Sequence, residues 1–308
     1  MKPETPADTA PRIISSAKAR LTRRRLLAGT GGLLGSSVVG TAAYAGGIEA
    51  QSLIVTRYAP KPPAWPDSRK LSITVIADIH AGGPNMTVAH IRRMVDLANE
   101  QKSDLVVLLG DYIATYGYMY GRMPNKIWAA ELAQLTASLG VWAVLGNHDW
   151  WHDVAGIRTS LTAVGIRVLE NDAVLLGREG AQFWLAGLGD QRAYRLGRGR
   201  YRGVDDLPRT LAKIRSGDPV VLLAHEPDIF VRVPARVALT LAGHTHGGQI
   251  RLPLIWPAFV PSKYGARYAY GHVVEDGRHM IVSGGLGTSF IPARLGVPPE
   301  VVQVVLGA

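Results

Sequence analysis

Residues 71–80 read LSITVIADIH, and this stretch decides the fold. Its first seven residues, Leu71 to Ala77, form a short apolar run with many β-branched side chains, which predicts a strand buried on both faces. Asp78 and His80 follow directly, so two residue types that bind metal ions lie at the end of that strand. A helical pattern at residues 87–100 comes next, and a strand followed by a helix is typical of a layered α/β fold.

The same arrangement recurs along the chain. Polar residues and glycines follow several apolar runs, and the resulting blocks are Asp78-Ile79-His80, Gly110-Asp111, Gly146-Asn147-His148-Asp149, His225 and Gly243-His244-Thr245-His246. The carboxyl ends of parallel strands joined by helical crossovers converge on one edge of a sheet. We therefore expect these blocks, although far apart in sequence, to meet around one site.

Twelve segments predict strands and two predict helices. The strands are expected at 71–77, 104–109, 141–145, 166–169, 173–176, 182–187, 219–223, 237–242, 248–252, 268–274, 279–283 and 300–306, and the helices at 87–100 and 126–139. The second half of the chain is rich in strands with few helical patterns between them. A mixed sheet, or two packed sheets with helices outside, accounts for this better than a purely parallel sheet.

Composition bounds the class of protein. The net charge is +10, but the first 25 residues hold seven basic and two acidic residues and so contribute +5. The remaining excess is mild, and a nucleic-acid-binding protein would gather basic residues on one face, so no nucleic-acid partner is favoured. The lack of cysteine excludes disulfides and thiolate metal sites.

The first 48 residues predict a targeting segment, and residues 49–308 predict a single catalytic domain. Arg23 and Arg24 precede the uncharged stretch 26–48 and resemble the twin-arginine signal that export machinery reads. Ala43-Tyr44-Ala45 has the small-x-small pattern of a cleavage site. An uncleaved membrane anchor and a disordered basic arm are the alternatives. Export would place the domain in the periplasm, or anchored to the membrane and facing outward.

The ligand types indicate the chemistry of the site. Carboxylates, an amide and imidazoles without thiolate suit Mn, Fe or Zn better than Ca²⁺. Asp111 is the natural bridge between two ions, because Gly110 lets the backbone approach closely. Two ions about 3.5 to 4 Å apart acidify a shared water to a bridging hydroxide and clamp the oxygens of a phosphoryl group. The blocks therefore predict a dimetal phosphoester hydrolase.

Together the blocks resemble the signature of the calcineurin-like metallophosphoesterase superfamily, D-x-H, G-D, G-N-H-[DE], H and G-H-x-H, across residues 71–250. The resemblance implies the family fold, an α/β sandwich of two mixed sheets flanked by helices. It also implies two divalent or trivalent metal ions. One ion would be held by Asp78, His80 and His246 and the other by Asn147, His225 and His244, with Asp111 bridging them.

The resemblance assigns His148 a role other than metal binding. Its counterpart in the family contacts a phosphoryl oxygen and assists the leaving group, while the following acid, here Asp149, orients the imidazole. A donor imidazole can neutralise charge that develops on the leaving oxygen.

Residues after the last block resemble one branch of the superfamily. PSKYG at 261–265, SGGLGT at 283–288 and RLGVPPE at 294–300 are similar to exported or membrane-associated bacterial members related to the UDP-diacylglucosamine hydrolases of lipid A synthesis. Ala114 occupies the position of the tyrosine ligand of purple acid phosphatases, so no Fe(III)-tyrosinate centre is expected. Because UDP-linked precursors are cytoplasmic, a substrate of that kind conflicts with export.

Substrate contacts are predicted beside the blocks. Arg195 and Arg198 belong to an arginine-rich span that is either a mobile loop recognising phosphate or lipid headgroups, or a solvated loop with scattered salt bridges. Trp150 follows the catalytic block and lines the substrate entrance or packs in the core. An apolar patch at 254–260 either touches a membrane or acyl chain or forms an ordered loop over the core.

Three functions fit the sequence. The preferred one is a dimetal phosphoesterase that acts outside the cytoplasm on a lipid-linked or other small phosphoester. A nuclease or cyclic-nucleotide phosphodiesterase of the same superfamily is the second. A non-catalytic interaction module on the same scaffold is the third, and the complete ligand set together with His148 argues against it.

Overall fold

The computed structural model describes residues 38–114, 122–252 and 259–307. The chain divides into two compact units, residues 1–42 and 43–308. In the first unit the described residues, 38–42, are helical. Within the described part of the chain, no helix has both the length and the hydropathy required to span a membrane.

The first sheet contains residues 71–76, which form its strand β2. Its six strands lie in the order β1 (Ile54–Tyr58), β14 (Glu300–Leu306), β2 (Leu71–Ile76), β3 (Leu105–Leu108), β4 (Val141–Ala143) and β5 (Arg167–Val168). Strands β2 to β5 are parallel to one another, whereas β14 runs antiparallel to β2. The carboxyl ends of β2, β3 and β4 therefore lie at one edge.

The second sheet is also mixed and also has six strands. Its order is β12 (Gly271–Glu275), β13 (Arg278–Val282), β11 (Val237–Ala242), β10 (Val220–Leu223), β7 (Phe183–Gly187) and β6 (Asp172–Leu176). The four central strands are parallel and the two edge strands are antiparallel to their neighbours. A separate hairpin pairs β8 (Tyr194–Gly197) with β9 (Arg200–Arg202).

Alternation along the strands explains how the two sheets pack. In β2, Ile73 and Val75 face the other sheet, where they share a core with Leu239 and Leu241, while Ile76 belongs to the core beneath the helices. Both faces of each central strand are therefore covered, which is why these strands are mostly apolar and even their polar residues Thr74 and Thr240 are buried.

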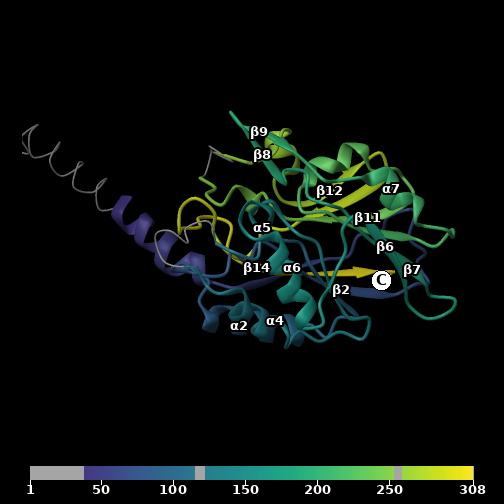
Figure 1. Ribbon diagram of the computed structural model, residues 1–308, viewed down its shortest axis with the longest axis horizontal. Coiled ribbons are helices and arrows are strands. Elements are labelled where there is room, and N and C mark those ends of the chain that lie inside the picture. The colour runs from purple at the N-terminus through teal and green to yellow at the C-terminus, as the bar shows by residue number, and fades with distance from the viewer. Residues whose placement is uncertain (1–37, 115–121, 253–258, 308) are drawn as a thin grey trace, which may run out of the picture. The chain divides into compact units, whose positions relative to one another are not determined.

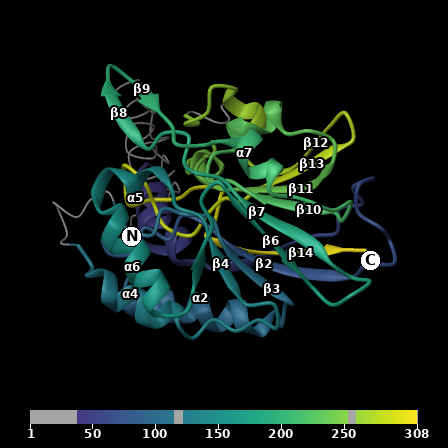
Figure 2. The same ribbon diagram turned by 45° about the vertical axis from the view of Figure 1, so that its right-hand side comes forward.

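Helices cover the outer face of each sheet (Figures 1 and 2). The first sheet packs on α2 (Val88–Glu100), α4 (Asn125–Leu132) and α6 (Val154–Ala163), and the second on α7 (Leu207–Ala212) and η3 (Pro227–Arg232). The fold is the predicted α/β sandwich of two mixed sheets flanked by helices. Thr87 caps α2 as expected, because its side chain accepts a hydrogen bond from the backbone N–H of His90.

Two predicted elements are wrong. The helix expected at 126–139 ends at Leu132, and Leu139 N–H instead bonds Asp104 O at the start of the neighbouring strand. The strand expected at 248–252 is absent from the described residues: η4 (His246–Gly248) occupies its start, and Ile250 makes only an isolated bridge. Left-handed φ angles of 80° at Gly248 and 55° at Gln249 prevent an extended backbone there.

Other elements were shifted or unforeseen, among them the helices α6 and α7, which the sequence analysis did not predict. The strand expected at 268–274 begins only at Gly271, since η5 (Gly265–Tyr268) precedes it. Strand β1 was not anticipated. The arginine-rich span that we expected to be a loop contains the β8–β9 hairpin. The apolar patch expected at 254–260 and the Arg23-Arg24 pair lie largely or wholly outside the described residues.

Candidate dimetal site

The structure brings all seven predicted ligands together at one end of the sandwich. Asp78 and His80 follow β2, Asp111 follows β3 and Asn147 follows β4; from the second sheet, His225 follows β10 and His244 and His246 follow β11. All seven side chains are buried. Both sheets thus contribute ligands at the edge where their parallel strands end.

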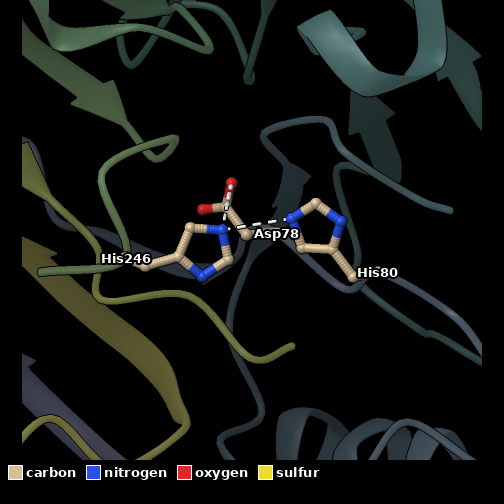
Figure 3. Close-up of side chains that lie close together, drawn as sticks. All are labelled: Asp78, His80 and His246. Atoms are coloured by element: carbon tan, nitrogen blue, oxygen red, sulfur yellow. Dashed lines mark hydrogen bonds and ion pairs between the residues drawn. The ribbon is translucent and has the colours of Figure 1, made fainter. Parts of the chain in front are cut away.

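Asp78, His80 and His246 form a cluster that we call the inner triad (Figure 3). His246 Nε2 lies 3.1 Å from His80 Nε2 and 3.7 Å from Asp78 Oδ1. Their ligand atoms all lie within 4.8 Å of one another. One cation placed among them would contact all three side chains.

Asn147, His225 and His244 form a second cluster, the outer group. His225 Nε2 lies 3.1 Å from Asn147 Oδ1 and 3.2 Å from His244 Nδ1. Asp111 lies between the clusters, since its Oδ2 is 3.3 Å from His225 Nε2 and 3.6 Å from His80 Nε2. This is the placement required of a carboxylate that bridges two ions.

Backbone carbonyls fix which ring nitrogens face the ions. His80 Nδ1 lies 3.0 Å from Ile113 O, and His225 Nδ1 lies 2.7 Å from Leu109 O. Each N–H donates to its carbonyl, so Nε2 points into the site. Partners of this kind orient metal-binding histidines and make them better ligands.

Electrostatics at the inner triad favour a cation. Burial lowers the pKa of both His80 and His246, so both rings are neutral, as a metal ligand must be. Burial also raises the pKa of Asp78 to about 7. Arg294 Nη2 lies 3.2 Å from His246 Nδ1, and His246 Nε2 faces His80. The residues present thus fit one cation.

The outer group has the same property. Burial disfavours the charged form of His225, but the Asp111 carboxylate outweighs burial and raises the pKa of the ring well above its usual value. Its Nε2 proton faces Asp111, Asn147 and His244 together. Burial lowers the pKa of His244, so this ring is neutral. The residues present thus fit a second cation.

An unusual backbone conformation directs five of the proposed ligands into the site. Asp78, His80, Asp111, His244 and His246 all have φ between 46° and 70°, in the left-handed region that non-glycine residues rarely adopt. The loops also approach closely at Gly146, where a Cβ would lie 2.7 Å from His225 Cε1. At Gly110, with φ of 95°, a Cβ would lie 2.8 Å from Gly146 Cα. The glycines of these motifs are thus required by sterics.

His148 and Asp149 begin the short helix α5 (Asn147–His152). His148 Nε2 lies 3.9 Å from Asp111 Oδ2, and burial lowers the pKa of the ring to about 3, so it is neutral. Asp149, which we expected to orient this ring, accepts hydrogen bonds from three backbone N–H groups, those of Gly146, Asp111 and Tyr112, at 2.8 to 2.9 Å. Through these contacts Asp149 ties the loop after β4, which carries Asn147, to the loop after β3, which carries Asp111.

A cavity of about 620 Å³ opens beside the clusters. Asp111, Asn147 and His148 form part of its lining, and Phe259, Phe290 and Ile291 form another part. Its polar and apolar walls suit a ligand with a charged group at one end and an apolar group at the other.

The predicted substrate contacts lie beside the cavity, not in its lining. Trp150 packs against Tyr194, with ring centroids 5.5 Å apart. Arg195 stacks on Trp151 at 3.6 Å, and Arg198 lies exposed at the turn of the hairpin. The lining residues on this side are Trp151, Arg192 and Tyr201.

Arg192 contacts the outer group. Its Nη1 lies 2.8 Å from His244 Nε2 and 3.1 Å from Pro261 O, and its guanidinium stacks on Tyr201 at 4.1 Å. Its backbone N–H donates to Asp190 at 2.7 Å, which fixes the start of the side chain. Arg192 belongs to the arginine-rich span for which phosphate recognition was one prediction, but the sequence does not single it out among the five arginines within eleven residues.

Arg294 contacts the inner triad, and sequence reasoning assigned it no role. It is fully buried, and its guanidinium donates to Gly284 O, Gly287 O and Val297 O as well as to His246. Arg294 therefore positions His246 of the inner triad and ties together the loop between β13 and β14. Its signal in the sequence is weak, since RLGVPPE reads as a turn-rich segment.

Comparisons with known proteins agree with this geometry. Residues 71–248 match the model of the calcineurin-like phosphoesterase family. The chain belongs to that family. It is 30% identical to the metallophosphoesterase YkuE of Bacillus subtilis over 297 residues, covering 93% of this chain and 98% of YkuE.

Two further relatives show similar agreement. The chain is 30% identical to a metallophosphoesterase of Aquifex aeolicus over 84% of this chain and 94% of the relative. It is 32% identical to the phosphodiesterase YaeI of Escherichia coli over 76% of this chain and 81% of YaeI. This calcineurin-like phosphoesterase is thus a metal-dependent hydrolase of phosphoesters, with two candidate metal positions.

Proposed function

We propose that this enzyme is a dimetal phosphodiesterase that acts outside the cytoplasm on a lipid-linked or other small phosphoester. The observation that carries the proposal is the mixed lining of one cavity, which Asp111 and His148 share with Phe259 and Ile291. A phosphodiester with an apolar substituent matches both walls. The name of the relative YaeI, a phosphodiesterase, supports the diester class.

Each side chain has a task in this reaction. The inner triad and the outer group would hold Mn, Fe or Zn ions, which supply an acidified water and neutralise phosphoryl oxygens. The neutral His148 ring donates one N–H toward the leaving oxygen. Arg192 adds a positive charge at the side of the outer group, where a phosphate oxygen of the substrate would lie.

Export belongs to the same proposal. The enzyme would be secreted through the twin-arginine machinery, within the exported branch related to UDP-diacylglucosamine hydrolases, but it would act on a lipid phosphoester without UDP. Ala45 is buried in the π-helical turn Tyr44–Ile48, and its carbonyl accepts a hydrogen bond from Arg294 N at 3.0 Å. This packing supports retention of the segment as an anchor. Replacing Arg23 and Arg24 by Lys should keep the protein inside the cell, and unchanged export would remove this part of the proposal.

A second candidate is a cyclic-nucleotide phosphodiesterase or nuclease. Trp151 and Tyr201 stack with ring centroids 5.7 Å apart in the cavity wall, beside Arg192, and such a platform suits a nucleobase.

A substrate panel tests the choice. Metal-loaded enzyme is assayed with phospholipids, nucleotide-lipids, cyclic nucleotides and single-stranded DNA, and with an aryl phosphodiester as a general substrate. We expect the phospholipids to give the highest kcat/KM. A preference for cyclic nucleotides or DNA would favour the second candidate, and no hydrolysis of any diester would contradict both.

His148→Asn tests the mechanism. Because His148 is not a proposed ligand, the variant should retain both ions and lose rate by about 10²- to 10⁴-fold. His279→Asn, a change on β13 away from the site, is the matched control and should keep normal activity. A loss of metal from His148→Asn would show that His148 is a ligand.

A further inference from the structure

Three large apolar side chains surround one side of the cavity mouth. Phe259, Phe290 and Ile291 are 61%, 68% and 50% exposed, and we call them the apolar rim. The rings of Phe259 and Phe290 contact each other edge to face, with centroids 6.1 Å apart. A contiguous exposed apolar patch at the mouth of a site marks an interaction surface.

The backbone holds the rim in place. Phe290 has φ of 67°, a left-handed conformation that is a genuine outlier for a bulky side chain. The buried Gln249 amide fixes the residues on both sides, since it accepts from Ser289 N at 2.7 Å and donates to Ile291 O at 2.9 Å. Backbone strain that a buried partner maintains often marks a functional position, so we infer that the exposure of the Phe290 ring serves a function.

The β8–β9 hairpin lies on the other side of the mouth. Arg195, Arg198, Arg200 and Arg202 are exposed, as is Leu196 at 52%, and residues 191–204 contain no acidic side chain. Arg195 stacks on Trp151 in α5, and Trp151 and Tyr201 line the same cavity as the rim. Both views show the hairpin and the loop before β14 on the same side of the sandwich (Figures 1 and 2).

We propose that the apolar rim and the hairpin together dock on an anionic lipid bilayer. The rim would enter the headgroup and acyl boundary, while the hairpin arginines would contact lipid phosphates. The inference rests on the proposed function, because docking in this orientation presents the cavity to a phosphoester in the membrane. Charge complementarity favours a bilayer over a neutral partner, and the three apolar side chains favour it over nucleic acid.

A site-specific label tests the position of the rim. The protein has no cysteine, so a single Ile291→Cys in the full-length chain takes one environment-sensitive fluorophore. Val274→Cys is the matched control, since Val274 is 54% exposed on the edge strand β12. With vesicles of phosphatidylcholine and phosphatidylglycerol, we expect a blue shift of the label at 291 and no shift at 274. Equal shifts, or none at 291 in bound protein, would overturn the proposal.

Charge reversal tests the hairpin. Arg198→Glu with Arg200→Glu should lower vesicle partitioning by about tenfold or more, and salt should lower that of the unaltered protein. Arg178→Glu, an exposed arginine between β6 and β7 at the opposite end of the sandwich, should not. Partitioning that the double variant leaves unchanged would contradict the role of the hairpin.

The outcome is separable from that of the proposed function. Hydrolysis of the soluble aryl phosphodiester by unaltered enzyme reports catalysis without a membrane. Activity without vesicle docking would overturn only the docking surface, whereas docking without activity would overturn only the catalytic proposal. A label at 291 that responds to single-stranded DNA and ignores vesicles would assign the surface to nucleic acid.

Discussion

The inner triad and the outer group are built from similar residues but differ in access. Of the inner triad only His246 lines the cavity, and Asp78 and His80 are 0% and 1% exposed, whereas both Asn147 and His244 of the outer group line it. A loop that Arg294 holds covers the other side of the inner triad, and the outer group opens toward Arg192. Two chemically similar positions can therefore serve different tasks, one for a retained ion and one for an ion that meets substrate.

The difference predicts different rates of exchange. An ion at the inner triad would reach the cavity only beside His246, and the loop that follows β13 covers its other side, where Arg294 bonds three carbonyls, so we expect this ion to exchange more slowly. An ion at the outer group faces the cavity directly.

Removal of the Asp111 carboxylate should affect both metal positions equally and should lower activity more than any other substitution. Asp111→Ala takes away the only carboxylate shared by both positions, so we expect loss of both ions and a fall in kcat/KM of about 10³-fold or more. Metal content by elemental analysis and hydrolysis of an aryl phosphodiester measure this. Normal turnover by the variant would rule out the dimetal arrangement.

Removing Arg294 should weaken the inner position selectively. Arg294→Met leaves several carbonyls and His246 Nδ1 without their donor, so the free energy of unfolding should fall by about 3 kcal/mol. Affinity for one of the two ions should fall about 10- to 100-fold. Calorimetric titration with Mn²⁺ resolves the two binding steps.

The matched control for Arg294→Met is Arg294→Lys, which keeps the charge but cannot bond all the carbonyls. If the lysine variant bound both ions normally, the charge alone would be responsible, and the hydrogen bonds would not matter.

Removing Arg192 should give the smallest effect, on the substrate side. Arg192→Ala leaves all seven proposed ligands, so metal content should stay the same, while KM should rise about tenfold through loss of a contact to phosphate. Arg236→Ala, at an exposed arginine near the start of β11, is the control. A variant that lost an ion instead would show that Arg192 supports His244.

The gathering of the proposed ligands could be predicted from the sequence because most of them follow a recognisable apolar strand. Asp78 and Asp111 come directly after Leu-rich or β-branched runs, and parallel topology then places them at one edge. His225 has no such motif of its own and was identified only through the family pattern. Arg294 could not be found in this way, because its partners are carbonyls brought near it by the fold.

The β8–β9 hairpin was not predicted because neither of its strands has a buried, regularly spaced apolar face. Tyr194-Arg195-Leu196 alternates charge with apolar residues but is exposed throughout, so no buried face marks it as a strand. The available signal is Arg198-Gly199, whose φ values of 51° and 70° match a two-residue hairpin turn. Helix α4 was overestimated because Leu135 and Leu139 continue its apolar pattern beyond the point where the backbone turns.

The five left-handed residues of the site have a consequence for engineering. His80, His244 and His246 each hold a conformation that costs roughly 1 to 2 kcal/mol relative to ordinary backbone, and glycine would adopt it freely. Selection of variants for thermal stability alone would therefore tend to replace these positions and yield a more stable, inactive protein. Stabilisation of this enzyme should instead be sought at the opposite end of the sandwich, where no ligand depends on an unfavourable φ.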